Sequence, residues 1–349
     1  MDGSVGGLDA ESGNRHLEFR QPRNMRYSGS TAGKSHLLTT LGIILPVFIV
    51  LAAGWIAVRT GYLDDKLSDH LNAFAVRLAV PVMLFRAMVD LDFGQAFQIS
   101  MLTGFYLGGF ASFFAGILLA KMVFGRRPGE AVAVGFCALF SNTVLLGIPI
   151  AQRAYGDEAM PAVYGIVALH AGIMYAVGMS SMELVRADGR SMSETVQAAA
   201  KSILANPLMI GVIAGILFNL SGLDLPLVIR APVDMLASAA IPAALVGLGA
   251  ALTRYQLKSE LAESLMVAAL SLILHPAITF AITHLWFGLP AEQVRIAVVV
   301  AAMPPGLNVY IFAVMYNRAV SLSASAILVT TSLSVVTIAG WLWLLEHIL

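Results

Sequence analysis

The sequence has little charge and almost no cysteine, and both shortages exclude whole classes of protein. Only 12% of its 349 residues are charged, and the formal net charge is zero. A neutral chain of this kind offers no large basic surface to nucleic acid or acidic lipid. The single cysteine, Cys137, excludes an internal disulfide and a cluster of thiolate ligands, and it fits a buried structural thiol.

The sequence also lacks the motifs of membrane-bound enzymes and pumps. No GxxxxGK[ST] loop is present for ATP, and the apolar segments contain no HExxH helix, aspartate pair or Ser–His pair for catalysis. These absences argue against an ATP motor and against an intramembrane enzyme, and no cofactor or metal site is predicted. A receptor is a third class, but the loops are too short to hold a soluble signalling domain.

What the sequence has in abundance is apolar residues, which make up 58% of the chain and give a mean hydropathy of +0.81. A helix needs about 20 apolar residues to cross a bilayer. Ten runs approach or exceed this length, so we predict an all-α membrane protein that forms one domain over residues 37–349. The predicted spans are 37–58, 70–91, 98–120, 131–152, 159–182, 202–220, 232–253, 263–285, 292–316 and 320–345.

Basic residues are distributed unevenly between the loops on the two sides of these spans. The loops after spans 1, 3, 5, 7 and 9 carry eleven Lys and Arg, whereas the opposite loops carry three. The positive-inside rule therefore predicts that both termini lie outside the cytoplasmic (inner) membrane. Residues 1–36 are polar, lack a signal-peptide pattern and are predicted to be a disordered tail, in which Met25 is an alternative start.

The two halves of the chain share a spacing of small and bend-forming residues. At an offset of 161 residues, Pro46, Gly54, Gly61 and Pro81 fall on Pro207, Gly215, Gly222 and Pro242. This offset makes spans 1–5 (residues 37–183) one repeat and spans 6–10 (residues 201–349) the other, joined by a cytoplasmic linker at 184–200. Five spans are an odd number, so the second repeat would be inverted, an architecture typical of secondary transporters.

The fourth span of each half contains a predicted break. Residues 139–156 read LFSNTVLLGIPIAQRAYG, and residues 301–317 read AAMPPGLNVYIFAVMYN. Pro304 and Pro305 remove two helical donors, and Gly306 adds a flexible joint. A broken helix within a bilayer persists only where protein or a water-filled cavity surrounds it, and the exposed helix ends then attract ions. Both breaks are therefore candidate substrate sites.

These two stretches together resemble the paired signatures of the auxin efflux carrier family, and the bacterial branch is the closer match. The resemblance covers residues 41–345. It implies two inverted five-helix repeats, as in bile-acid and sodium/proton transporters, with substrate bound where the unwound spans four and nine cross. It also implies a homodimer. Plant members carry a long central loop that this chain lacks, and a proline at the position of Ser141.

Transferred residue by residue, the resemblance implies that the crossing places a short segment of span four against one of span nine. Asn142, Thr143 and Asn308 could hydrogen-bond substrate there. The implied site residues are Phe140, Ser141, Asn142, Thr143, Pro304, Pro305, Gly306 and Asn308.

Four ionisable residues within the predicted spans require separate roles. Arg86 is expected to pair with Asp90, one helical turn later. Arg77 has no local partner, so it either faces the cavity as an anion-binding site residue or reaches the cytoplasmic headgroups. His170 and His275 either carry a proton during transport or hydrogen-bond a neighbouring span.

The sequence therefore predicts a secondary carrier that moves small organic anions by alternating access, through an elevator-like or rocking motion. Two substrate classes follow from the resemblance: dicarboxylates such as malate or malonate, and amphipathic acids such as indole-3-acetate. One Arg at most reaches the cavity, which favours a monoanion or a dianion accompanied by a proton. The alternative is a membrane receptor that uses the same fold without transport. The direction of transport, the coupling ion and the oligomeric state do not follow from the sequence.

Overall fold

The computed structural model describes residues 32–185, 197, 201, 204–255 and 260–349, and within these ranges the chain forms helices and no strand. Most of the predicted tail, including Met25, and most of the predicted linker lie outside the described residues. Cys137 is a buried thiol, as predicted, and its Sγ lies 3.4 Å from the Ser323 hydroxyl.

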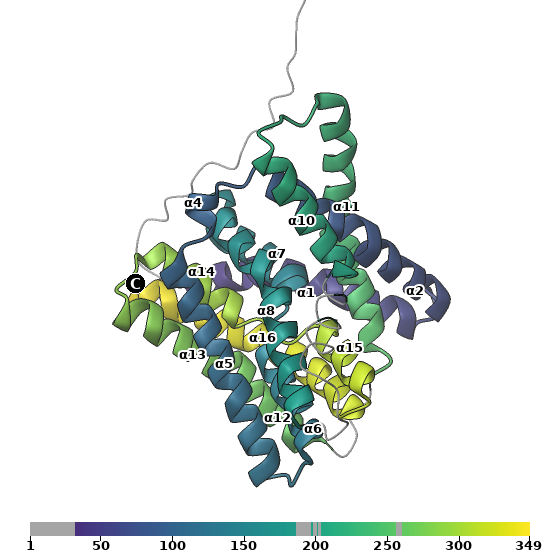
Figure 1. The fold of residues 1–349 in the computed structure, drawn as a ribbon, viewed down its shortest axis with the longest axis vertical. Helices are drawn as coiled ribbons and strands as arrows, with labels where there is room; N and C mark the ends of the chain where they lie inside the picture. Colours follow the sequence, from purple (N-terminus) through teal and green to yellow (C-terminus); the bar gives the residue numbers. More distant parts are fainter. Residues whose placement is uncertain (1–31, 186–196, 198–200, 202–203, 256–259) are drawn as a thin grey trace, which may run out of the picture.

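The helices are numbered as in Figure 1. In chain order they are α1 (Ala32–Arg59), α2 (Asp65–Phe74), η1 (Ala75–Ala79), α3 (Val80–Val89), α4 (Phe93–Ala96), α5 (Ile99–Met122), α6 (Pro128–Leu139), η2 (Thr143–Gly147), α7 (Ile148–Tyr155), η3 (Asp157–Ala159), α8 (Met160–Val185), α10 (Pro207–Leu220), α11 (Leu227–Leu252), α12 (Leu261–Ala269), η4 (Leu270–Leu274), α13 (His275–Phe280), η5 (Ala281–Trp286), α14 (Ala291–Ala301), α15 (Leu307–Tyr316) and α16 (Val320–Ile348).

Seven described helical stretches are long and apolar enough to cross a membrane, which makes the chain a multi-pass membrane protein. They correspond to predicted spans 1, 2, 3, 5, 7, 8 and 10. The other three positions differ from a single long helix. Predicted spans 4 and 9 are each divided by a non-helical break, and the sixth is the shorter helix α10, which begins at Pro207.

Three prolines leave a clear mark on the long helices. A π-helical turn ends two residues before each of Pro81, Pro149 and Pro276, and each proline stands in the first turn of the α-helix that follows. Proline cannot donate the helical i→i−4 hydrogen bond. A π-helical turn, with its wider i→i−5 bonds, lets the backbone accommodate the proline while the helix continues. The chain thus continues past these prolines and breaks completely elsewhere.

The helices pack as two groups (Figure 1). In the first group, α1 and α3 pack on α11, and α10 packs on α3, with α2 also against α11. In the second group, α5 packs on α6, α13 and α14, while α12 packs on α16 and α8 on α6. Both broken segments belong to the second group, so the breaks lie beside the first group rather than inside it.

Two glycines bring the helices of the first group together. A Cβ on Gly54 of α1 would lie 2.1 Å from the Val246 carbonyl oxygen of α11, and a Cβ on Gly215 of α10 would lie 2.6 Å from the Phe85 carbonyl oxygen of α3. Gly54 and Gly215, like Phe85 and Val246, are 161 residues apart. Backbones approach this closely only where small residues line the interface.

A charged cluster ties α3 to α11 at one end of the first group. Arg86 forms ion pairs with Asp90, as predicted, and with Asp234. Arg230 donates two hydrogen bonds of 3.0 Å to the two Asp90 carboxylate oxygens. Partial burial would raise the pKa of Asp90, but hydrogen bonds from Arg230 and Arg86 hold this pKa below its usual range.

Asp90→Asn is expected to lower the stability of the folded protein modestly at neutral pH. Because the folded-state pKa of Asp90 is depressed, its contribution is present above the unfolded pKa of 3.8 and is lost as the pH falls through the folded value. Asp90 is 45% exposed, so solvent screening limits the loss to about 1 kcal/mol. Thermal unfolding of detergent-purified protein at pH 7 and pH 3 measures the difference.

Asp224→Asn serves as the matched control, because Asp224 is exposed and forms no ion pair with a described residue. This variant should unfold at the wild-type temperature at both pH values. An Asp90→Asn defect as large at pH 3 as at pH 7 would contradict an electrostatic origin.

Candidate functional site

The two broken helices meet at their breaks. Ser141 and Pro305 form an isolated antiparallel β-bridge. Beside it, the backbone N–H of Asn142 donates a 2.8 Å hydrogen bond to the backbone carbonyl of Pro304. Residues 140–142 and 302–306 are not helical on either side of this contact. Two backbone segments that would otherwise be unsatisfied in a bilayer thus partly satisfy one another.

The break after α14 follows from its prolines. Without N–H groups, Pro304 and Pro305 cannot continue the helical hydrogen bonds, and α14 ends at Ala301. The chain re-enters a helix at Leu307, with Gly306 as the N-cap residue and no side chain capping the new helix. The first N–H groups of α15 therefore begin at the crossing without a side-chain partner, and they carry the positive end of the helix dipole.

The break after α6 occurs without a proline. Asn142 takes the cap position of the following turn, where its Oδ1 accepts a 3.2 Å hydrogen bond from the Leu145 N–H. Its carbonyl also accepts a 3.0 Å bond from the Gly147 N–H. Asparagine favours such cap positions because its side chain replaces a helical acceptor. Its Nδ2 group makes no hydrogen bond to the described residues.

A buried histidine holds the span-four segment in place. His275 of α13 has its Nε2 3.1 Å from the Phe105 carbonyl and its Nδ1 3.4 Å from the Ser141 hydroxyl. A carbonyl only accepts, so Nε2 carries the proton, and in the neutral ring Nδ1 accepts from Ser141. Gly108 permits the approach, since a Cβ there would lie 2.8 Å from the His275 carbonyl. His275 thus has the neighbouring-span role that the sequence left open.

The crossing opens onto a cavity of about 100 Å³ between the two helix groups. One wall belongs to the first group and is largely apolar, with Asn72 as its polar residue. The other wall belongs to the second group and carries the amide and hydroxyl groups of both breaks. Its polar and glycine members are Ser141, Asn142, Thr143, His170, Gly306 and Asn308. The described lining residues include no Asp, Glu, Lys or Arg, so the field that they create in the cavity comes from dipoles rather than fixed charges.

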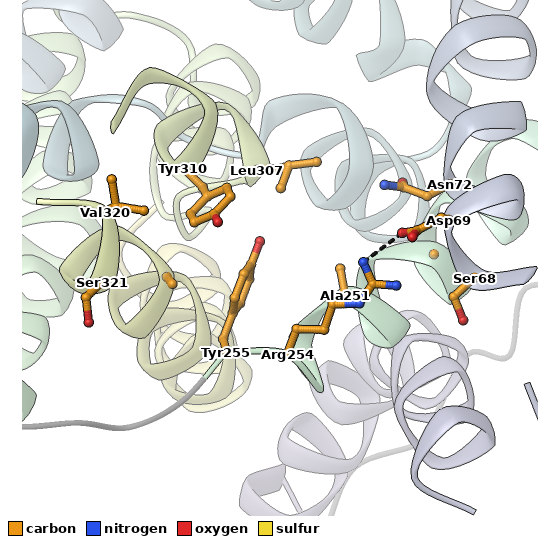
Figure 2. Close-up of a pocket in the computed structure, with 12 residues that line it drawn as sticks. Ser68, Asp69, Asn72, Ala251, Arg254, Tyr255, Leu307, Tyr310, Val320 and Ser321 are labelled. Atoms are coloured by element: carbon orange, nitrogen blue, oxygen red, sulfur yellow. Dashed lines mark hydrogen bonds and ion pairs between the residues drawn. The ribbon is translucent and has the colours of Figure 1, made fainter. Parts of the chain in front are cut away.

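A larger vestibule of about 610 Å³ adjoins this cavity, and the two share Asn72, Ala251 and Leu307 (Figure 2). Tyr255 and Tyr310 face one another across it, with ring centroids 5.7 Å apart. Arg254 and Asp69 form an ion pair at its side, with Nη1 and Oδ1 2.7 Å apart. Through these shared residues, the vestibule connects one end of the molecule with the crossing cavity.

A third cavity, of about 390 Å³, lies at the other end and shares no lining residue with the crossing cavity. The charged cluster of Arg86, Asp90 and Asp234 lines it, together with Asp157 and Tyr164 of the second group. Among the described residues, the crossing cavity therefore adjoins the vestibule and not this third cavity.

The structure brings most of the predicted site residues together. Ser141, Asn142, Thr143, Gly306 and Asn308 line the crossing cavity, as does Phe140. Pro304 and Pro305 are buried behind it and form the backbone contact with span four.

Arg77 lies apart from the other predicted residues. Its side chain is exposed, and it does not line the crossing cavity. The face of span two that does line it consists of Asn72, Val76, Val80 and Leu84. Arg77 is the residue after Val76, so its side chain points about 100° away from this face and not into the cavity.

Two polar residues of the site were not predicted. Asn72 lines both the cavity and the vestibule, and the Tyr175 hydroxyl donates a 3.3 Å hydrogen bond to Asn308 Oδ1. Asn72 begins the four-residue spacing that lines the cavity, so a polar residue on an apolar helix face was an available signal. Tyr175 offered none, because only the packing of α8 against α15 defines its partner. No group of three potential metal ligands occurs among the described residues.

Comparison with known proteins gives concordant matches. A family model described as membrane transport protein matches residues 39–342. A Rhizobium meliloti protein named as a malonate transporter is 27% identical over 87% of this chain and 95% of its own length. Auxin efflux carrier component 8 of Arabidopsis thaliana is 21% identical over 86% and 96%. The mouse lysosomal cholesterol signaling protein is 24% identical over 86% of this chain but 37% of its own length.

Proposed function

The chain belongs to the membrane transport protein family, which includes the auxin efflux carriers, and we propose that it is a secondary carrier for small organic anions. It is a transporter and not an enzyme. The specific proposal concerns the substrate, its site and the motion that exposes the site to each side.

One observation carries the proposal: two broken helices meet at a cavity that is rich in dipoles and has no Asp, Glu, Lys or Arg among its described lining residues. The uncapped start of α15 supplies N–H groups and positive potential, and Asn142 and Asn308 supply amides. Such an arrangement binds a carboxylate without a fixed cation that would trap it. Ser141, Asn142, Thr143, Gly306 and Asn308 are the proposed contacts, and Pro304 and Pro305 hold the crossing open.

We assign ten spans in two inverted repeats, residues 37–183 and 201–349, with the broken segments as spans four and nine. The paired glycine contacts support this assignment, because residues 161 apart make equivalent contacts. The two end cavities support it as well. At offsets of 161 or 163 residues, lining residues of one fall on lining residues of the other: Arg86 on Gly247, Asp90 on Ala251, Asp157 on Val320 and Pro161 on Ala324.

The proposed orientation follows from the basic loops, which place Arg254 and the vestibule on the cytoplasmic side and both termini outside the inner membrane. In this orientation the described conformation is open to the cytoplasm. Because the crossing belongs to the second helix group, a movement of that group against the first would open the site to the outside. We propose that transport uses this movement, in an elevator-like or rocking mechanism.

A receptor function is less favoured. The relatives named for transport match this chain over 95% and 96% of their own length. The relative named for signaling is matched over 37% of its length, so most of that protein has no counterpart in the matched region.

Flux into reconstituted vesicles tests the carrier function. The purified protein is expected to move labelled malonate, indole-3-acetate or both, at rates that depend on an imposed pH or voltage gradient. Protein-free vesicles and an excess of unlabelled acid are the controls. Vesicles in which no tested acid moves, together with protein that binds none, would contradict the proposal.

A further inference from the structure

His170 is a buried side chain of the crossing cavity that forms no hydrogen bond with the described residues. It is 2% exposed and lines the cavity, yet neither Nδ1 nor Nε2 has a partner among the described residues. The Ser141 backbone lies nearby without forming a bond of acceptable geometry. Burying an imidazole without hydrogen bonds is unfavourable, so a polar ligand that bonded the ring would be stabilised by it.

The surrounding side chains hold the ring but offer it nothing polar. The Phe140 ring packs edge-on against it with centroids 4.7 Å apart, and Phe105 lies at 5.7 Å. Tyr106 lies at 6.5 Å, but its hydroxyl already donates to the Ile166 carbonyl. None of these side chains can therefore hydrogen-bond His170, and the cavity is the side from which a ligand can reach the ring.

The other titratable groups near the ring are already engaged. His275 of α13 bonds Phe105 and Ser141 with its two nitrogens, and Tyr175 on the same helix as His170 donates to Asn308. Among the described residues that line the cavity, none is Asp, Glu, Lys or Arg. A carboxylate that entered alone would be stabilised only by the dipoles of the crossing, and its full charge would not be neutralised in this poorly solvated site.

We propose that His170 is the carboxylate-binding residue of this cavity and that each substrate carboxylate binds together with one proton. The proton comes from water in the vestibule and binds a ring nitrogen, so a neutral imidazole becomes an imidazolium beside the carboxylate. The pair is electrically neutral overall, and the amides at the crossing satisfy the remaining carboxylate oxygen. This inference rests on the proposed carrier function and refines its substrate.

The balance of charge defines the substrate class. One imidazolium neutralises one carboxylate, so the site suits monocarboxylates and dicarboxylates that retain one proton. Transport of a monocarboxylate would then carry one proton in the same direction and move no net charge. Release on the far side returns the proton to water and leaves His170 neutral.

Titration calorimetry on the full-length protein in detergent tests the proposal. Indole-3-acetate is injected at pH 7 in phosphate and in Tris, whose ionisation enthalpies differ, so the difference in heat reports protons taken up. Wild-type protein is expected to take up about one proton per bound acid. His170→Gln keeps a donor and an acceptor but cannot hold the proton, so it should show no uptake and at least tenfold weaker binding.

His284→Gln is the matched control, because this histidine packs on Phe280 and does not line the cavity. It should retain both the affinity and the proton uptake of the wild type. Wild-type protein that binds and transports the acid without proton uptake would overturn the role of His170 and leave the carrier function intact. This measurement uses only wild-type protein, so it still tests the proposal if His170→Gln fails to fold.

Two further outcomes would also count against it. Unchanged proton uptake in His170→Gln would assign the proton to another group. If wild-type protein neither binds nor moves any tested acid, the carrier function fails, and the role of His170 fails with it.

Discussion

Asn142→Ala and Asn308→Ala are each expected to reduce substrate flux at least tenfold while the protein remains folded in the membrane. Both amides line the cavity at the crossing, and each lost hydrogen bond to a charged substrate is worth about 1.5–3 kcal/mol. Asn308 is also oriented by the Tyr175 hydroxyl, so its amide is fixed before substrate arrives. Flux of the transported acid in vesicles, normalised to inserted protein, measures the loss.

The cap role of Asn142 complicates its alanine variant. Loss of the bond from Leu145 to Oδ1 costs about 1 kcal/mol of stability in addition to any effect on substrate. Asn142→Ser separates the two effects, because serine keeps a cap acceptor but has no amide N–H₂ for the substrate. Serine should restore thermal stability without restoring transport. Wild-type flux in both Asn142→Ser and Asn308→Ala would reduce these residues to packing roles.

Gly249→Ala is expected to be the most destabilising of the small substitutions in the first helix group. A Cβ at this position would lie 1.8 Å from the Leu51 carbonyl oxygen, and at Gly54 it would lie 2.1 Å from the Val246 carbonyl oxygen. Backbone atoms cannot rotate away, so α1 and α11 must separate along their length. Overpacking of this kind costs about 3 kcal/mol. Thermal unfolding and the yield of monodisperse protein measure the effect.

Gly42→Ala provides the control within the same helix as Gly54. A Cβ on Gly42 would have no neighbour within 4 Å, and alanine favours the helix over glycine. This variant should match or slightly exceed wild-type stability. Equal stability of Gly42→Ala and Gly249→Ala would show that α1 and α11 do not depend on the close contact.

The break in span nine was predictable because its cause is local. Pro304 and Pro305 cannot donate helical hydrogen bonds in any environment, and the structure breaks at this point. The break in span four was predicted from its matching position in the repeat and from the family resemblance, and not from a proline at the break, since Ser141 replaces the proline found in plant members. Its cause is not local: the Pro304 carbonyl and His275 hold the segment open from other helices.

The roles of Arg77, His170 and His275 could not be predicted from the sequence, because they depend on the direction in which each side chain points. Arg77 and Val76 are adjacent in sequence, yet Val76 lines the cavity and Arg77 is exposed. His170 and His275 looked alike as isolated histidines in apolar spans. Packing separated them, because Phe105 and Ser141 occupy both nitrogens of His275 and no described residue occupies those of His170.

The sequence alone determined that this protein is a multi-pass helical membrane protein, that one helix must break at Pro304 and Pro305, and that its halves share a spacing of glycines and prolines. These properties depend on hydropathy and on backbone chemistry, which each residue carries with it. The tertiary structure decided which polar groups share a cavity, which histidine lacks a partner among the described residues and which of the two end cavities adjoins the crossing. Those properties depend on contacts between helices far apart in the chain, and no local pattern specifies them.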